Sequence, residues 1–171
     1  VTGLFTAPAR IGPAPRNILV ILLSEMGSIV LAGPMFAQLR RQYPGAAIHI
    51  LQLKKNQEVT KLLQLTAPEY MHSLDDSSGG SLVRDILAVS LKMRRMGLDA
   101  VIDCELFSRV SALLSFSTGA PVRVGFTPHT QEGLYRGSFI NHAIPYNPYQ
   151  HISKQFLSLV DALQASDHMP R

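Results

Sequence analysis

The chain has 171 residues, of which 46% are hydrophobic and 16% are charged, a composition that is typical of one globular domain and excludes an intrinsically disordered protein. Its formal net charge is only +4, and its aromatic residues are not interleaved with the basic ones, which argues against a nucleic-acid-binding module. The single cysteine, Cys104, excludes an internal disulfide and a cysteine-based metal site, and no apolar run reaches the roughly 18 residues of a membrane span.

The predicted elements begin after a lead rich in Pro, Gly and Ala, residues 1–16, that we expect to be flexible. Because the chain starts without Met, we expect it to be part of a longer protein. The aliphatic run 17–23 predicts a strand buried on both faces. The turn 24–28 leads into an amphipathic helix that Pro44 and Gly45 end, and Pro34 either kinks that helix or begins it. A strand at 47–53, a short helix at 56–65 and a strand at 69–74 follow.

The second half continues the alternation. Ser81 is expected to cap a helix over 82–96, and Gly97 to close it. The further expected elements are a strand at 100–103, a helix at 108–117, a strand at 122–126, a polar loop at 127–137, an extended piece at 141–145 and a helix at 151–163. Residues 166–171 would begin a linker or tail. Strands and helices at this spacing predict an α/β domain over residues 17–165, a Rossmann-like, doubly wound parallel sheet with helices on both faces.

Ligands bind at the carboxyl ends of strands in such sheets, so the turns 24–28, 103–109 and 125–137 are candidate sites. In the first turn, backbone N–H groups and a helix dipole suit an anion or a sugar hydroxyl. Its single glycine, Gly27, excludes a dinucleotide fingerprint and a phosphate-binding P-loop. Gly27 would permit the turn and Ser28 would cap the helix. Glu25 is either a general base or an exposed loop carboxylate.

The second turn carries two carboxylates, Asp103 and Glu105, which point the same way only while the backbone is extended. Asp103 alternatively braces a neighbouring loop through backbone N–H groups. Ser108 suits a helix cap, whereas Arg109 is poorly placed against the helix dipole, which favours a functional or pairing role for it. The histidines lack metal-ligand spacing, and no Gly-x-Ser-x-Gly motif occurs, so neither a metal site nor a serine-hydrolase triad is predicted.

Basic residues occur in short groups rather than in one long run. The groups are Arg40-Arg41, Lys54-Lys55 with Lys61, and Lys92 with Arg94-Arg95. One interpretation is that they are solvated helix faces. The other is that they form a face attracted to an acidic partner, which could be anionic lipid, an acidic glycan or nucleic acid.

Several segments, taken in this order and spacing, resemble the bacterial heptosyltransferases of glycosyltransferase family 9. The segments are 18–34, 39–50, 98–114, 119–126 and 149–160, and the likeness spans about residues 17–164. That family transfers heptose from an ADP-sugar onto the inner core of lipopolysaccharide.

The resemblance implies one half of a GT-B fold, the N-terminal half that holds the acceptor. The nucleotide-sugar donor, similar to ADP-heptose, would then bind a missing C-terminal domain, and this domain would hold no cofactor and be inactive alone. Ser24, Gly27, Asp103, Glu105, Ser108 and Arg109 would line the acceptor cleft. The implied acceptor is an acidic glycan or a lipopolysaccharide core. The implied location is cytoplasmic, with peripheral contact at the inner membrane and no nucleic-acid partner.

One departure from the family pattern concerns catalysis. The family's first turn typically reads Gly-Asp, with the Asp as general base, and Ser28 stands at that position here. A serine hydroxyl cannot take up a proton near neutral pH as a carboxylate does. Either Glu25 or another carboxylate substitutes, or the acceptor differs, or the protein is a catalytically dead binding module.

Overall fold

Six parallel strands form one sheet in the computed structural model, which describes residues 14–106, 108–127 and 139–163. The strand order is β3-β2-β1-β4-β5-β6, and every neighbouring pair is parallel. This is the order of the doubly wound Rossmann fold, so the predicted fold class is confirmed. The strands are β1 (Asn17–Ile21), β2 (Ala47–Leu53), β3 (Met71–Leu74), β4 (Ala100–Asp103), β5 (Val122–Thr127) and β6 (His142–Pro145).

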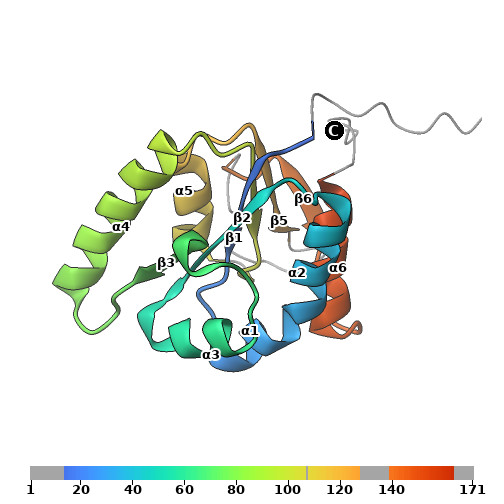
Figure 1. Cartoon of the computed structure of the whole chain (residues 1–171), viewed down its shortest axis with the longest axis horizontal. Coiled ribbons are helices and arrows are strands. Elements are labelled where there is room, and N and C mark those ends of the chain that lie inside the picture. Colours follow the sequence, from blue (N-terminus) through green and yellow to red (C-terminus); the bar gives the residue numbers. More distant parts are fainter. Residues whose placement is uncertain (1–13, 107, 128–138, 164–171) are drawn as a thin grey trace, which may run out of the picture.

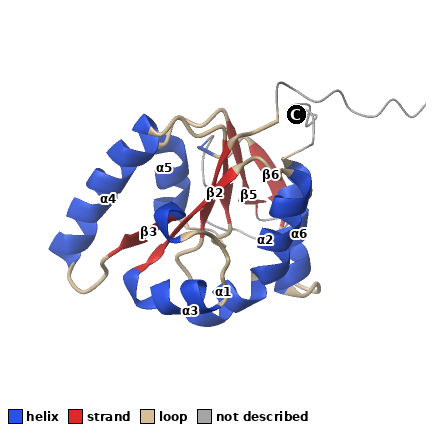
Figure 2. Cartoon of the chain, in the orientation of Figure 1, coloured by secondary structure: helices blue, strands red, loops and turns tan. Residues whose placement is uncertain are grey.

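Helices cover both faces of the sheet (Figures 1 and 2). One face packs against α1 (Met26–Leu31), α2 (Gly33–Gln42), α3 (Gln57–Leu62) and α6 (Ile152–Ala162). The other face packs against α4 (Gly79–Arg95) and α5 (Arg109–Ser117). Two short 3-10 turns, η1 (Lys54–Asn56) and η2 (Pro68–Tyr70), flank α3 and β3. Among the described residues, no helix combines the length and the apolarity needed to cross a membrane.

The central strand β1 explains why its sequence is continuously aliphatic. Ile18 and Val20 enter the core under α1, α2 and α6, whereas Leu19 and Ile21 enter the core under α4 and α5. All four side chains have no exposed surface. The prediction of a strand buried on both faces is therefore confirmed, although β1 ends at Ile21 and not at residue 23.

Local signals predicted most helix ends; the structure decides between the two roles of Pro34 and corrects the cap of α4. Pro34 has the second of the two roles considered for it: α1 ends before Ala32, and Pro34 lies in the first turn of the next helix, α2. The N-cap of α4 is Ser78 and not Ser81. Ser81 sits three residues later and completes a capping box with Ser78. Gly97 follows the helix at φ 63°, a left-handed conformation that favours glycine.

Two histidines are buried beneath α4, one on each of two neighbouring strands. Nδ1 of His49 lies 3.2 Å from Nε2 of His72, and Nζ of Lys92 lies 3.2 Å from Nδ1 of His72. An ammonium group only donates, so Nδ1 of His72 accepts and its Nε2 carries the proton that it donates to His49. Burial, with the charge of Lys92 and then His49, lowers the pKa of His72 to about 4, and burial and Lys92 lower the pKa of His49. Both rings are therefore neutral in the folded protein near neutral pH.

This network predicts a loss of stability in mild acid. Between the ordinary histidine pKa of 6.5 and the folded value of about 4, the unfolded chain binds more protons than the folded one. His72 contributes at most about 3 kcal/mol to the free energy of unfolding. This contribution is fully present above pH 6.5 and is lost as the pH falls from 6.5 toward about 4. Urea unfolding followed across the window measures it. A His72→Gln variant should show a shallower pH dependence, and an unchanged slope would contradict the assignment.

Candidate functional site

The strand order reverses between β1 and β4, and the carboxyl ends of these two strands form the usual ligand edge of such a sheet. The turns that follow them lie side by side, because the backbone N–H of Cys104 donates to the carbonyl of Ile21 at 3.0 Å. On the other side of β1, the N–H of Leu22 donates to the carbonyl of Leu51 in β2 at 2.9 Å. The first and second predicted turns are therefore brought to one place.

The carboxylate of Glu105 holds the turn after β1. Its Oε1 accepts hydrogen bonds from the backbone N–H groups of Leu23 and Ser24, at 2.6 and 2.8 Å. The Ser24 hydroxyl lies 2.9 Å from both carboxylate oxygens. Since charge-assisted hydrogen bonds of this kind are stronger than neutral ones, Glu105 fixes the position of Ser24. Its own oxygens are engaged by donors of the protein, which suits a positioning role better than proton transfer.

Asn56 holds the same turn from the side of β2. Its Nδ2 donates to the carbonyl of Ser24 at 2.8 Å, and the residue is 1% exposed. The sequence predicted Asn56 only as the start of a short helix. The available signal was its place just after β2, which puts a short polar side chain at the same edge as Ser24.

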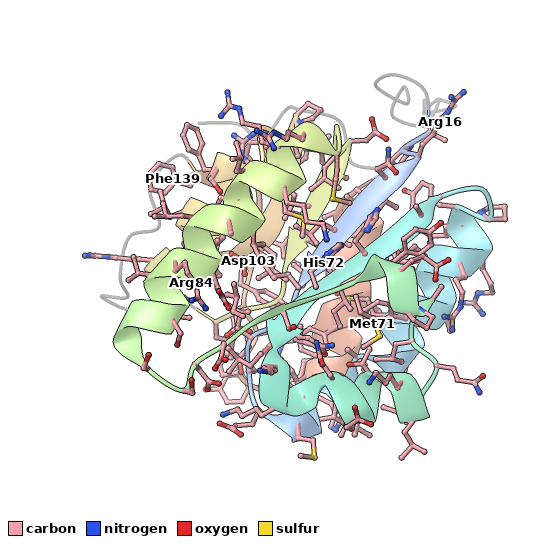
Figure 3. All side chains as sticks on the ribbon, turned by 60° about the vertical axis from the view of Figure 1, so that its left-hand side comes forward. Arg16, Met71, His72, Arg84, Asp103 and Phe139 are labelled. Carbon is pink, nitrogen blue, oxygen red and sulfur yellow. The ribbon has the colours of Figure 1, made fainter. Side chains whose placement is uncertain are left out.

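Asp103, at the end of β4, is fully buried and its Oδ1 accepts from the backbone N–H of Glu105 at 3.0 Å (Figure 3). This contact agrees with the bracing role considered for Asp103. Cys104, between these two residues in sequence, points into the core under α1, α2 and α6. Its thiol lies 3.9 Å from the sulfur of Met35. Burial raises the pKa of the Cys104 thiol, with further contributions from Asp103 and Glu105, so the thiol stays protonated and unreactive.

The structure corrects two expectations for the first turn. The N-cap of α1 is Glu25, so Ser28 is not the cap, and Gly27 lies inside the helix without a positive φ. The Ser28 N–H donates to the carbonyl of Glu25 at 2.9 Å, and the Ser28 side chain is half-buried. The surface above Gly27 is open, since an added Cβ would meet nothing within 4 Å. A ligand can therefore approach the backbone there.

Glu25 is the accessible carboxylate of this turn. Its side chain is 86% exposed, and one oxygen lies 3.5 Å from Nζ of Lys55, which also lies 3.7 Å from Asp76. Lys55 follows β2, so it comes from the same edge of the sheet as Glu25. An exposed carboxylate beside an ammonium group can exchange a proton with a bound hydroxyl, whereas the lysine can bind an anionic group.

The start of α5 completes the edge. Ser108 is its N-cap, as predicted, and the Ser108 hydroxyl accepts from the N–H of Ser111 at 3.2 Å. Arg109 is the first residue of the helix and is exposed. Most of the third predicted turn, residues 128–138, lies outside the described residues. Within the part of the chain that the structure describes, no group of three or more His, Cys, Asp or Glu side chains is placed to hold a metal ion.

The hydrogen bonds between the Glu105 carboxylate and the turn at Leu23 and Ser24, which we call the clamp, give a direct prediction. Glu105→Gln replaces one acceptor oxygen by an amide that cannot accept, so we expect a loss of about 2 kcal/mol in the free energy of unfolding. The backbone amide resonances of Leu23 and Ser24 should shift in the same variant. Glu69→Gln, which neutralises an exposed carboxylate in η2, is the control and should change stability by less than about 0.5 kcal/mol. Equal effects of the two substitutions would refute the clamp.

Comparison with known proteins gives a match in fold but not in sequence. No family model matches the chain, and no curated protein matches it. A glycosyl transferase family 9 structure from Veillonella parvula aligns with a TM-score of 0.72 and 16% identity, over 90% of this chain and 42% of that one. The E. coli heptosyltransferase WaaC with ADP-2-deoxy-2-fluoro heptose aligns with a TM-score of 0.67 and 16% identity, and WaaC with ADP aligns with 0.66 and 17%. These alignments cover 91% of this chain and 50% and 49% of the WaaC chains. The chain spans about half the length of these structures, and its fold is the Rossmann-like α/β fold found in them.

Proposed function

We propose that this chain is the acceptor-binding half of a glycosyltransferase, which moves a sugar from an ADP-sugar to an acidic acceptor of the lipopolysaccharide-core type. The observation that carries the proposal is the edge at β1 and β4, where Glu105 and Asn56 hold the turn at Ser24 in place. Fold likeness to WaaC, whose structures were determined with ADP and a fluorinated ADP-heptose, supports the reaction class. The donor would bind a second half.

The charges around the edge support an acidic, hydroxyl-rich ligand. Lys54, Lys55 and Arg109 are exposed beside it. The ion pairs that the structure shows for the two lysines are long, 3.4 Å from Lys54 to Asp75, and 3.5 and 3.7 Å from Lys55 to Glu25 and Asp76. Exposed pairs of this length contribute little, so phosphate or carboxylate groups of a ligand can replace the partners. The turn also lacks the glycines with which a dinucleotide or a P-loop nucleotide would be bound.

Glu25 is the best-placed general base of the described edge. The Glu105 carboxylate is hydrogen-bonded to the turn, and Asp103 is buried. The Ser28 hydroxyl is too weak a base to accept a proton from the acceptor near neutral pH. In the proposed step, the acceptor hydroxyl gives its proton to Glu25 while its oxygen bonds to the anomeric carbon of the donor sugar. The bond from that carbon to the nucleotide's phosphate oxygen breaks, and ADP leaves with the electron pair.

The proposal predicts selective binding of the acceptor by this chain. Titration with a phosphorylated lipopolysaccharide-core oligosaccharide should move the amide resonances of Ser24, Gly27 and Arg109, and titration with ADP should leave them in place. Arg109→Ala should weaken oligosaccharide binding about tenfold, because it removes a cation that would donate a charge-assisted hydrogen bond to an acidic group of the ligand. Arg41→Ala, which removes an exposed charge from the distant helix α2, should leave the affinity unchanged.

ADP shifts at this edge with no response to the oligosaccharide would refute the acceptor assignment. If Arg109→Ala and Arg41→Ala weakened oligosaccharide binding equally, the binding would depend only on the net charge of the chain. The edge would then not be the binding site.

A second candidate function follows from Ser28. It stands at the family's Asp position, half-buried inside α1, so a module that binds the acceptor without transferring sugar is the alternative. In the full-length protein, Glu25→Gln should lower sugar transfer about a hundredfold if Glu25 is the base. Under the alternative, transfer is absent from the start, and Ser28→Asp does not create it. A measurement of donor turnover with wild type, Glu25→Gln and Ser28→Asp separates the two functions.

A further inference from the structure

The outer side of α4 is apolar, although none of the residues that the structure describes covers it. Its inner side, with Met93 buried, packs against the sheet. On the opposite side Val83, Leu87 and Leu91 recur every four residues and are 59%, 67% and 51% exposed. Side chains at this spacing form one row along a helix. A surface helix normally presents polar residues there, so this row needs an explanation.

The neighbouring helix α5 continues the apolar surface. Val110 and Leu113 point outward with 52% and 54% exposure. The two helices lie side by side on the same face of the sheet (Figure 1). The Ser117 hydroxyl of α5 donates a hydrogen bond to the Ser90 hydroxyl of α4 at 3.0 Å. We call the exposed sides of α4 and α5 together the outer face. It includes Val83, Leu87, Leu91, Val110, Leu113, Arg84, Arg94 and Arg95.

The two helices that carry the outer face also hold the excess positive charge of the chain. Of 16 Lys and Arg residues and 12 Asp and Glu residues, α4 and α5 hold five of the former and one of the latter. The rest of the sequence is therefore neutral on balance, and the net charge of +4 belongs to these two helices. The five cations are Arg84, Lys92, Arg94, Arg95 and Arg109, of which Lys92 turns inward to His72 and does not belong to the outer face. The one acid, Asp85, lies 3.4 Å from the exposed Arg84, which is labelled on α4 in Figure 3.

We propose that the outer face docks on the surface of an anionic lipid bilayer. Exposed aliphatic side chains interleaved with arginines are what a helix lying in the membrane interface requires. The aliphatic row would enter the boundary between headgroups and acyl chains, and the arginines would contact lipid phosphates. Each cation near an anionic surface adds to the affinity, and the neutral remainder of the chain gives this face the preferred orientation.

A second copy of the chain fits this surface less well. A symmetric dimer through α4 would bring Arg84, Arg94 and Arg95 against the same residues of the partner, with only one acidic side chain per helix to offset them. Like charges held together at an interface are destabilising. An anionic lipid surface has the complementary charge and needs no matching shape. The inference depends on the outer face alone and not on the proposed transfer reaction.

Vesicle flotation tests the proposal with the 171-residue chain. The chain should float with phosphatidylglycerol-rich vesicles at low salt, and not with vesicles of phosphatidylcholine alone. Arg94→Glu should weaken binding about tenfold through reversal of one charge, and Leu87→Ser about fivefold through loss of an inserted side chain. Both positions are exposed, so circular dichroism should show unchanged folding.

Matched controls decide whether the outer face is responsible. Arg41→Glu makes the same change of charge on α2, and Leu62→Ser removes a leucine that is 81% exposed on α3. Both should bind the vesicles within about twofold of wild type. The proposal is overturned if the controls weaken binding as much as the outer-face variants, or if no vesicle binds. It is equally overturned if light scattering finds a dimer that Leu87→Ser dissociates while flotation is absent.

Discussion

The contact on which the candidate site depends is the one between Glu105 and the turn at Leu23 and Ser24. Parallel pairing sets the ends of β1 and β4 next to each other, and the carboxylate then takes up backbone N–H groups that no strand can satisfy. Without it, two donors and a hydroxyl would lie at the edge without fixed positions. The reversal of strand order places β1 and β4 side by side, and the hydrogen bonds of Glu105 then fix the conformation of the turn after β1.

The support extends to three strands and explains which groups remain available. Asn56 after β2 holds the Ser24 carbonyl, and Asp103 at the end of β4 holds the N–H of Glu105. These polar side chains form hydrogen bonds within the protein that hold the edge together. Its exposed surface includes Glu25, the cations Lys54, Lys55 and Arg109, and the open backbone at Gly27. A rigid, internally bonded layer beneath an exposed layer of charged groups is the arrangement that a binding site for a polar ligand requires.

The sequence predicted elements well where the cause is local, and it missed partners where the cause is distant. The bounds of β2 and β4, the cap at Ser108 and the left-handed Gly97 follow from runs of apolar residues and from capping chemistry. Glu105 was predicted at the site, but its bonds to Leu23 and Ser24 join residues more than 80 positions apart, which no periodicity reveals. Similarly, Ser78 and Ser81 are both plausible caps, and only the path of the loop selects between them. The helix expected at 56–65 ends at Leu62 as α3, and Gln64 just beyond it has a left-handed backbone. Glutamine rarely adopts that conformation, so its amino-acid type did not predict this end.

The two proposed surfaces share an element of the fold. In a parallel α/β sheet, a helix begins where the preceding strand ends, so α4 and α5 both start at the carboxyl edge that carries the candidate site. Arg109 lies at this edge, and Val110 and Leu113, one and four residues on, belong to the outer face. A bilayer in contact with α4 and α5 would therefore lie next to the edge. An acceptor that is itself a lipid could then reach the turn at Ser24 while its acyl chains stay in the membrane, so a glycosyltransferase of this geometry would not need to extract its substrate.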